Sequence, residues 1–183
     1  MRYIALLRGI NVGANGRIRM DALKQLMELA GFTRVVTYIQ SGNVLFDSDL
    51  PESAARETIE RALKDGAGIT TTAVLRTADE LHALVRDCPF PQDQINAAQA
   101  ANLDGESFYV CLMNEEPDEK TLTKLAALEQ GSDLFVLSGR TIYLLLTQSV
   151  RTSQLAIRLN RIFPNMTSRN WNTMMKLNEL SLS

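Results

Sequence analysis

The order in which strand-like and helix-like segments alternate is the feature that most constrains the fold of this chain. An apolar run at 3–7 indicates a buried strand, and apolar residues at helical spacing within 21–30 indicate a helix that stops at Gly31. Two β-rich runs, 35–40 and 44–46, flank a short turn, which predicts a hairpin of antiparallel strands.

The next segments complete a recognisable topology. A helix is predicted at 51–64, where Glu and Arg or Lys alternate at four-residue spacing on the outer side, and a strand is predicted at 69–76. This βαββαβ order is the ferredoxin-like one. Residues 77–80, Thr-Ala-Asp-Glu, have the form of a capping box and predict a short helix through Val85.

The second half of the chain repeats the order βαββα. A strand is predicted at 108–113, a helix at 117–128, a hairpin over 134–146 and a helix at 152–163. No closing strand is predicted here, and a C-terminal helix at 171–180 takes its place. We therefore predict an α+β fold with two ferredoxin-like (βαββα-type) subdomains and antiparallel-rich sheets.

The boundaries of these subdomains follow from where the periodic segments stop. The first subdomain is predicted at 1–86, a linker at 87–104, and a second α+β subdomain with a C-terminal helix at 105–183. The linker begins near Cys88-Pro-Phe-Pro91, where prolines end the preceding helix.

Composition bounds the class of protein. The 183 residues are 45% hydrophobic and 22% charged, as in an ordinary globular protein. No apolar run approaches the ~20 residues that span a bilayer, and the N-terminus turns polar at Arg8, so we expect a cytoplasmic protein with no membrane partner. Cys88 and Cys111 have no C-x-x-C partner, which fits a reducing compartment.

Charge is distributed unevenly along the chain. Residues 1–46 and 151–183 each carry a net charge of +4, so the middle, 47–150, carries −10 of a total of −2. If the two ends meet, they form a basic face that attracts anions. The alternative is that these charges lie on separate solvated faces.

A loop of arginines, asparagines and glycines follows the first predicted strand, at 8–17. It is not a P-loop, because Asn11 stands where the first glycine belongs and Arg17-Ile18 follows Gly16; the dinucleotide motif fails at Asn11 as well. Such a loop can aim backbone N–H and guanidinium groups at an anion. It can equally be a structural crossover in which asparagines satisfy the backbone and arginines pair with carboxylates.

Two further polar segments share this composition, at 40–43 and 167–173. The first has the form of a hairpin turn, and in the second Asn170 can cap a helix while Trp171 anchors a core. The functional interpretation is that Arg169 and the first helical turn bind an anion. We expect Arg8, Asn11, Asn43 and Arg169 to lie close together. The ligand-binding candidates are Arg8, Asn11, Arg17, Ser41, Asn43, Arg169, Asn170 and Trp171.

No catalytic set is recognisable. His82 is the single histidine and lies in a short helix away from the polar segments, so a histidine-based mechanism or a metal site of several His or Cys residues is not expected, and no cofactor is indicated. Whether the chain is an enzyme stays open; Tyr38 or a carboxylate would then carry the proton.

Three functions compete. The first is binding of a small anionic ligand, phosphorylated or carboxylated, at a site formed by both chain ends. The second is a nucleic-acid module, since βαββαβ is also the order of the RNA-recognition fold, although the segment 41–46 offers only Phe46 for stacking. The third is a structural or interaction role without a small-molecule site. The oligomeric state is not predicted.

The three polar segments, in their order along the chain, carry a family resemblance. Residues 3–13, 37–44 and 168–173 resemble the signatures of domain-of-unknown-function family 1697, a bacterial family of small cytoplasmic proteins. The resemblance implies an α+β fold with ferredoxin-like parts. It implies no reaction, substrate or catalytic residue.

Overall fold

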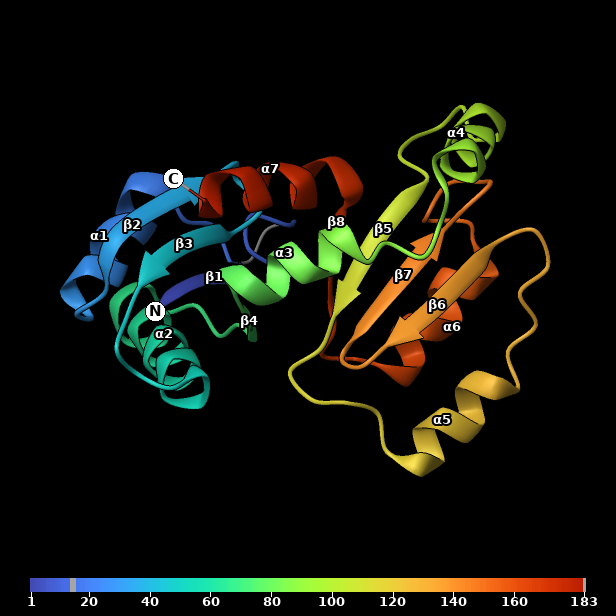
Figure 1. Cartoon of the computed structure of the whole chain (residues 1–183). Helices are drawn as coiled ribbons and strands as arrows, with labels where there is room; N and C mark the ends of the chain where they lie inside the picture. Colours follow the sequence, from blue (N-terminus) through green and yellow to red (C-terminus); the bar gives the residue numbers. More distant parts are fainter. Residues whose placement is uncertain (14–15, 183) are drawn as a thin grey trace. The chain divides into compact units, whose positions relative to one another are not determined.

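The computed structural model describes residues 1–13 and 16–182 and divides into two compact units, coloured by sequence in Figure 1. The first unit comprises Met1–Arg86 and Met175–Ser183, and the second comprises Asp87–Met174. Each is described by itself below. Ala14 and Asn15 of the predicted loop lie outside the described residues.

The first unit is a four-stranded antiparallel sheet in the order β2-β3-β1-β4. This strand order, with the helices placed after the first and third strands, is ferredoxin-like. Its elements are β1 (Arg2–Leu7), α1 (Met20–Leu29), β2 (Thr33–Tyr38), β3 (Asn43–Asp47), α2 (Glu52–Ala67), β4 (Ala73–Thr77) and α3 (Ala78–Arg86).

The second unit repeats this topology in the order β6-β7-β5-β8. The predicted α+β fold of two ferredoxin-like subdomains with antiparallel sheets is thereby confirmed. The elements are α4 (Gln92–Ala101), β5 (Phe108–Leu112), α5 (Glu119–Ala126), β6 (Leu134–Ser138), β7 (Thr141–Leu145), α6 (Gln154–Ile162), β8 (Thr167–Asn170) and α7 (Trp171–Ser181).

Three features differ from the sequence-based expectation. The second unit has a closing strand, β8, which pairs with β5; its Thr-Ser-Arg-Asn sequence has no apolar alternation to reveal it. The segment 87–104 contains α4, in which only Ala98 is buried, so its helical pattern is weak. The part of α7 from Met175 onward groups with the first unit rather than with residues 105–174.

The core of the first unit lies between its sheet and α1 with α2. Tyr3, Ala5 and Leu7 alternate along β1 and point to this side, while Ile4 and Leu6 are buried on the other side. Tyr3 stacks on Phe46 with ring centroids 5.6 Å apart. Because both faces of β1 are covered, its side chains read as one continuous apolar run.

The second unit buries both sides of its sheet in a similar way. Cys111, Ile142 and Leu144 belong to one core, which α6 covers through Leu155 and Leu159. Aromatic rings fill the other side, where Trp171 stacks on Phe108 with centroids 4.6 Å apart and Phe90 meets Phe108 edge-on at 5.6 Å. The rings add geometric specificity to the area they bury.

The capping box predicted at 77–80 is present. The Thr77 N–H donates to Glu80 Oε2 at 2.8 Å, and the Glu80 N–H donates to Thr77 Oγ1 at 3.2 Å. This reciprocal pair satisfies two backbone donors that a helix start leaves without helical partners, so it fixes where α3 begins directly after β4.

Gly42 allows the turn between β2 and β3 to pack against the end of β1. Its φ is +79°, and a Cβ atom there would lie 2.9 Å from Ile10 Cβ and 3.1 Å from Leu7 Cβ. Its carbonyl accepts the Leu7 N–H at 2.8 Å. Both the backbone conformation and the space therefore require glycine.

We predict that Gly42→Ala lowers the free energy of unfolding by about 2–3 kcal/mol, because it adds overpacking to backbone strain. The matched control is Gly68→Ala at φ +66°, where a Cβ atom meets nothing within 4 Å; strain alone costs about 1 kcal/mol there. Urea unfolding followed by circular dichroism measures both. Equal losses would show that the contact with Ile10 is not tight.

The two cysteines differ in accessibility. Cys111 is buried, and burial raises the pKa of its thiol to about 12; Cys88 is half-buried, and burial raises its pKa to a lesser degree. We predict that a small disulfide reagent rapidly labels one thiol per native chain. This rapid labelling should disappear in Cys88→Ser, which assigns it to Cys88. Rapid labelling of Cys111 in the folded protein would contradict this assignment.

Candidate functional site

A hollow of 690 Å³ lies beside the loop that follows β1, and we call it the Arg8 hollow. Two segments of the first unit form it, the loop itself and the connection between α2 and β4. Arg8 is exposed at this site. The lining residues are Arg8, Gly9, Val12, Gly16, Gly68, Ile69, Thr70, Thr71 and Thr72.

Hydrogen bonds fix the two walls against each other. The Arg8 N–H donates to the Thr72 carbonyl at 3.0 Å, and Thr71 Oγ1 donates to the Arg8 carbonyl at 2.7 Å. These bonds continue the pairing of β1 with β4 past the end of both strands. The backbone at Arg8 is therefore held in place while its side chain remains exposed.

The loop closes on itself near its glycines. The Asn11 N–H donates to the Gly16 carbonyl at 2.9 Å, and a Cβ atom on Gly16 would lie 2.8 Å from the Gly9 carbonyl oxygen. Because that neighbour is backbone, only glycine fits at 16. The close approach brings both ends of the loop to the same side of the hollow.

Asn11 holds this loop to the rest of the first unit. Its amide nitrogen donates to the Ile18 carbonyl at 3.0 Å and to the Gln40 carbonyl at 2.8 Å, and its amide oxygen accepts the Ile18 N–H at 2.9 Å. The residue adopts a left-handed conformation with φ +56°, which asparagine tolerates better than most residues. Asn11 thus shapes the loop instead of lining the hollow.

Ser41 and Asn43 also work within the fold. Asn43 is fully buried, and its amide nitrogen donates to the Tyr38 carbonyl at 3.1 Å and to Ser41 Oγ at 3.0 Å. These bonds close the turn between β2 and β3 from inside. The pattern matches the hairpin interpretation of segment 40–43.

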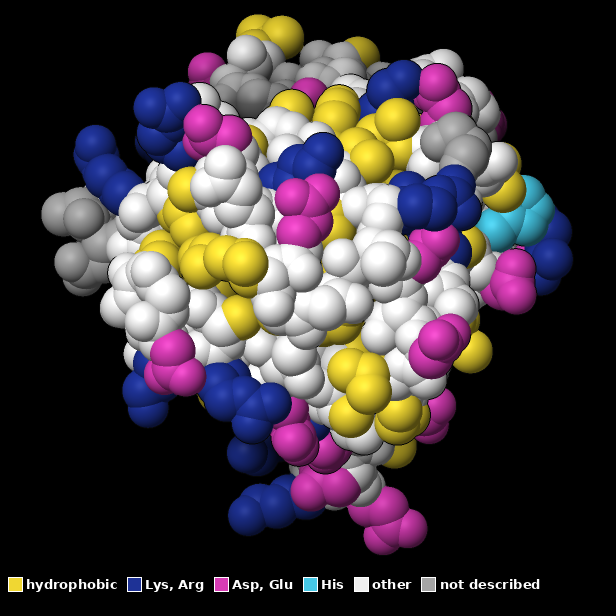
Figure 2. Space-filling model, turned by 90° about the vertical axis from the view of Figure 1, so that its left-hand side faces the viewer, with side chains coloured by type: hydrophobic (Ala, Val, Ile, Leu, Met, Phe, Trp, Pro, Cys, Tyr) yellow, Lys and Arg dark blue, Asp and Glu magenta, His cyan; other side chains and the backbone are white. Residues whose placement is uncertain are grey.

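Four of the six basic side chains in segment 1–46 have a carboxylate partner. Arg2 and Arg34 both pair with Asp47, Arg19 pairs with Asp21, and Lys24 lies 3.8 Å from Glu28. In Figure 2, Lys and Arg side chains alternate with Asp and Glu over the face shown. Arg17 Nε donates to the Gly13 carbonyl at 3.2 Å. Asp21 and Glu28 are already counted in the net charge of +4, and Asp47 lowers it only to +3, so the basic face stays a prediction.

The three candidates near the C-terminus have structural contacts in the second unit. Arg169 donates to Thr167 Oγ1 and to the Ser168 carbonyl, both at 2.9 Å, and burial lowers the pKa of its guanidinium to about 10. Asn170 Oδ1 accepts the Thr173 N–H at 2.8 Å, so it caps α7. Trp171 stacks on Phe108. Arg8 and Arg169 belong to different units, and their convergence on one site stays a prediction.

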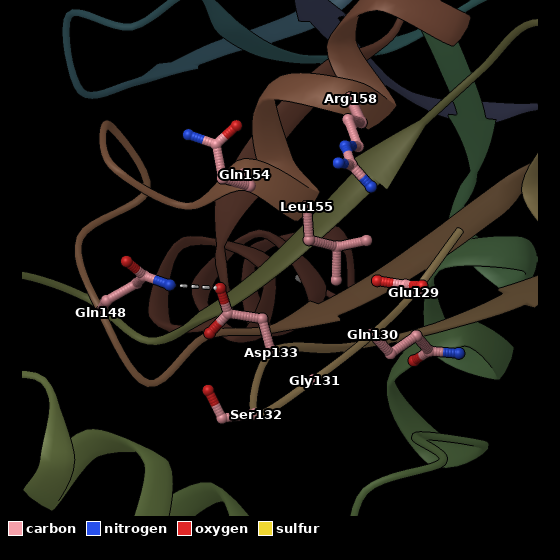
Figure 3. Close-up of a pocket in the computed structure, with 9 residues that line it drawn as sticks. All are labelled: Glu129, Gln130, Gly131, Ser132, Asp133, Gln148, Gln154, Leu155 and Arg158. Carbon is pink, nitrogen blue, oxygen red and sulfur yellow. Dashed lines mark hydrogen bonds between the residues drawn. The ribbon is translucent and has the colours of Figure 1, made fainter.

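A second, smaller hollow of 260 Å³ lies in the second unit beside Asp133 (Figure 3), and we call it the Asp133 hollow. It lies between the segment that precedes β6 and the start of α6. Gln148 turns its amide toward Asp133, as the dashed line shows. The lining residues are Glu129, Gln130, Gly131, Ser132, Asp133, Gln148, Gln154, Leu155 and Arg158.

Asp133 is a buried carboxylate with four hydrogen bonds. Oδ1 accepts from the Thr147 N–H at 2.9 Å and from Thr147 Oγ1 at 3.1 Å, while Oδ2 accepts from Gln148 Nε2 and Ser153 Oγ, both at 2.8 Å. Burial alone would raise the pKa of this carboxyl group, but the four bonds outweigh it and lower the pKa. Asp133 therefore ties the entry of β6 to the segment after β7 and to the cap of α6.

Sequence reasoning missed both Asp133 and the threonines at 70–72. Asp133 follows Gly131-Ser132 before an apolar strand, a pattern typical of any turn. Thr70, Thr71 and Thr72 precede β4 and read as part of that strand. Their place at the hollow depends on pairing with a loop about sixty residues away, which no local pattern encodes.

Two negative findings apply to the described residues. Within residues 1–13 and 16–182, no group of three or more His, Cys, Asp or Glu side chains could hold a metal ion. In the same part of the chain, no helix combines the length and apolar character needed to cross a membrane.

Fold and site together define an α+β protein of two ferredoxin-like units in which a glycine-rich loop follows the first strand. The chain belongs to the family described as "Protein of unknown function (DUF1697)", whose model matches residues 1–143. A conserved bacterial protein from Streptococcus pneumoniae, SP0830, has a similar solved structure, with a TM-score of 0.76 and 20% sequence identity over 98% of each chain. At this identity the similarity shows the fold alone. No curated protein matches the chain with significance.

We predict that Asp133→Asn lowers the free energy of unfolding by about 2–3 kcal/mol at pH 7. Both carboxylate oxygens accept hydrogen bonds, so the amide nitrogen that replaces one of them would point at a donor and leave it without an acceptor. The native pKa of Asp133 lies below the unfolded one, so its stabilisation is present above about pH 4 and is lost as the pH falls through the lowered native pKa. Denaturant unfolding from pH 7 to pH 2.5 measures this: the difference between wild type and variant should shrink toward acid. Asp93→Asn, on the exposed side of α4, is the control. A difference independent of pH would contradict the assigned pKa.

Proposed function

We propose that the first unit binds a small anionic ligand, phosphorylated or carboxylated, in the Arg8 hollow. The observation that carries this proposal is a comparison of the two units. The connection from β1 to α1 spans twelve residues, 8–19, whereas the topologically equivalent connection from β5 to α5 spans six, 113–118. The same topology therefore forms with a connection half as long.

The extra residues also differ in chemistry. The longer connection contains Arg8, Arg17 and Arg19 together with three glycines and two asparagines. The shorter one contains Glu115, Glu116 and Asp118. A long, polar, internally bonded loop on a rigid sheet is typical of a binding element. Arginine at such a loop suits a phosphate or carboxylate, because its planar fork donates two parallel hydrogen bonds.

The surroundings of Arg8 are suited to an anion of modest size. Thr70, Thr71 and Thr72 add hydroxyl groups to the lining, and a hollow of 690 Å³ is within the range of small-molecule sites. The Asn11 amide and the bonds of Arg8 with Thr71 and Thr72 hold the backbone before a ligand arrives. Such preorganisation lowers the entropy cost of binding.

A nucleic-acid role on the sheet is less well supported. RNA-recognition folds stack bases on an open face of the two central strands. Here β1 and β3 bury their residues on both sides, apart from half-buried ends at Arg2 and Asp47. We therefore favour the small anion.

The test compares Arg8→Ala with Arg19→Ala, a matched exposed arginine that lies outside the hollow lining. Inorganic phosphate and a short dicarboxylate are titrated at constant ionic strength, with chloride as the reference anion, and binding is measured by calorimetry and by the rise in Tm. We expect Arg8→Ala to weaken binding by about tenfold or more while Arg19→Ala leaves it unchanged, and we expect affinity to fall with added salt. No binding to the wild type, or an equal effect of both variants, would reject the proposal.

The expected contribution of the second chain end is tested with the same probes. Arg169→Ala should abolish the phosphate-induced rise in Tm if Arg169 contributes to the ligand site. A lower Tm with an unchanged phosphate effect would instead assign Arg169 a role in stabilising the fold, to which its bonds with Thr167 and Ser168 contribute.

A further inference from the structure

The strand β6 forms an edge of the sheet of the second unit, and its composition is unusual for an edge. Its sequence, Leu-Phe-Val-Leu-Ser, contains no charged residue, no proline and no bulge in its pairing with β7. Val136 at its centre is 37% exposed. Natural proteins protect exposed strand edges with charges, bulges or prolines.

The equivalent edge of the first unit carries these protections. Strand β2 contains Arg34, whose φ is +47°, and its pairing with β3 shifts register between Thr33 and Val36. Arg34 also forms an ion pair with Asp47. The two units thus have the same topology with one guarded edge and one regular apolar edge, so the difference is not imposed by the fold.

The register of β6 identifies the backbone groups that point outward. Ser138 and Thr141 close a hairpin with a two-residue loop, so the pairs Ser138–Thr141, Val136–Tyr143 and Leu134–Leu145 are hydrogen-bonded ones. The N–H and C=O groups of Phe135 and Leu137 therefore face away from β7. Gln130 confirms this direction, because its Oε1 accepts the Phe135 N–H at 2.8 Å. Within the described residues, no backbone group bonds Leu137 on this side.

We propose that β6 pairs with β6 of a second copy of this chain, antiparallel and centred on Val136. A two-fold axis through Val136 places Phe135 opposite Leu137 of the second copy, so outward donors meet outward acceptors in both directions. In each copy, the Leu137 N–H donates to the Phe135 carbonyl of the other copy, and the Phe135 N–H donates to the Leu137 carbonyl of the other copy. The two Val136 side chains become direct cross-strand neighbours on one face.

A second copy is the occupant that the observations favour. The strand is self-complementary about its own centre, and it contains no charge that would repel its own copy across the axis. The symmetric pairing joins two chains and occupies the β6 edge of each, so no third copy can add at β6.

The Gln130 side chain competes with this pairing for a backbone donor of β6. Two of the four intermolecular backbone bonds use the Phe135 N–H, which Gln130 occupies in the single chain. Pairing therefore releases that side chain. Removing the amide should favour association, which a merely exposed apolar strand would not predict.

Sedimentation velocity of the full chain over a wide micromolar range is the first test. We expect a monomer–dimer equilibrium in the wild type, a rise of about tenfold or more in the dissociation constant for Val136→Lys, and a fall for Gln130→Ala. The matched control is Val36→Lys on the guarded edge β2, where valine is 42% exposed; it should leave the equilibrium unchanged. A monomer at all concentrations, open-ended oligomers, or equal effects of both lysines would overturn the proposal.

A cross-linking experiment decides the matter if Val136→Lys fails to fold. Directly opposed residues of a non-hydrogen-bonded pair approach closely enough for a disulfide. In a Cys88→Ser background, Val136→Cys should form a covalent dimer under mild oxidation with glutathione disulfide, which takes up the two electrons of the two thiols. Val36→Cys is the control. Equal yields from the two variants would overturn the two-fold pairing at Val136.

Discussion

Each unit depends on a central strand that is hydrogen-bonded on both sides and buried on both faces. In the first unit β1 lies between β3 and β4, and in the second β5 lies between β7 and β8. The residue at which each strand ends is fixed in the same way: Leu7 donates to the carbonyl of Gly42, and Met113 donates to that of Arg140. The neighbouring hairpin turn thus determines where each central strand releases the chain. The connection after each central strand, which in the first unit is the Arg8 loop, begins at that residue.

Polar side chains with several hydrogen bonds then hold the irregular segments outside the sheets. Asn11 joins both sides of its loop to the turn at Gln40, and Asp133 joins two connections to the cap of α6. Satisfied polar groups of this kind define one arrangement, because an unbonded alternative leaves buried donors or acceptors without partners. Hydrogen-bonded connections therefore border both hollows, and each hollow lies on a connection longer than the equivalent one in the other unit.

The two units show how a repeated topology can diverge. Their strand orders are the same, yet one has a basic glycine-rich connection and a guarded edge, and the other has a short acidic connection and a regular apolar edge. Because the fold tolerates either version, these differences are free to serve binding and association. Similarity to the Streptococcus pneumoniae structure extends over both units and concerns this shared framework.

Periodicity by itself determined the class of fold, since apolar spacing identifies strands and helices wherever one side is buried, as in β1, α2 and β7. Periodicity missed β8, because its residues are polar and its pairing with β5 orders it. It also missed α4, because too few of its residues are buried and packing on β5 orders it. Local chemistry likewise predicted the capping roles of Thr77 and Asn170, which the structure confirms, whereas Arg8 as a ligand-binding residue stays a prediction. Only the tertiary structure decided that Asn11 and Asn43 bond inward, that Arg2 and Arg34 share Asp47, and that the threonines at 70–72 reach Arg8. Those outcomes depend on contacts between distant residues, and a sequence pattern records a residue's own donors and acceptors but not the partner that folding brings to them.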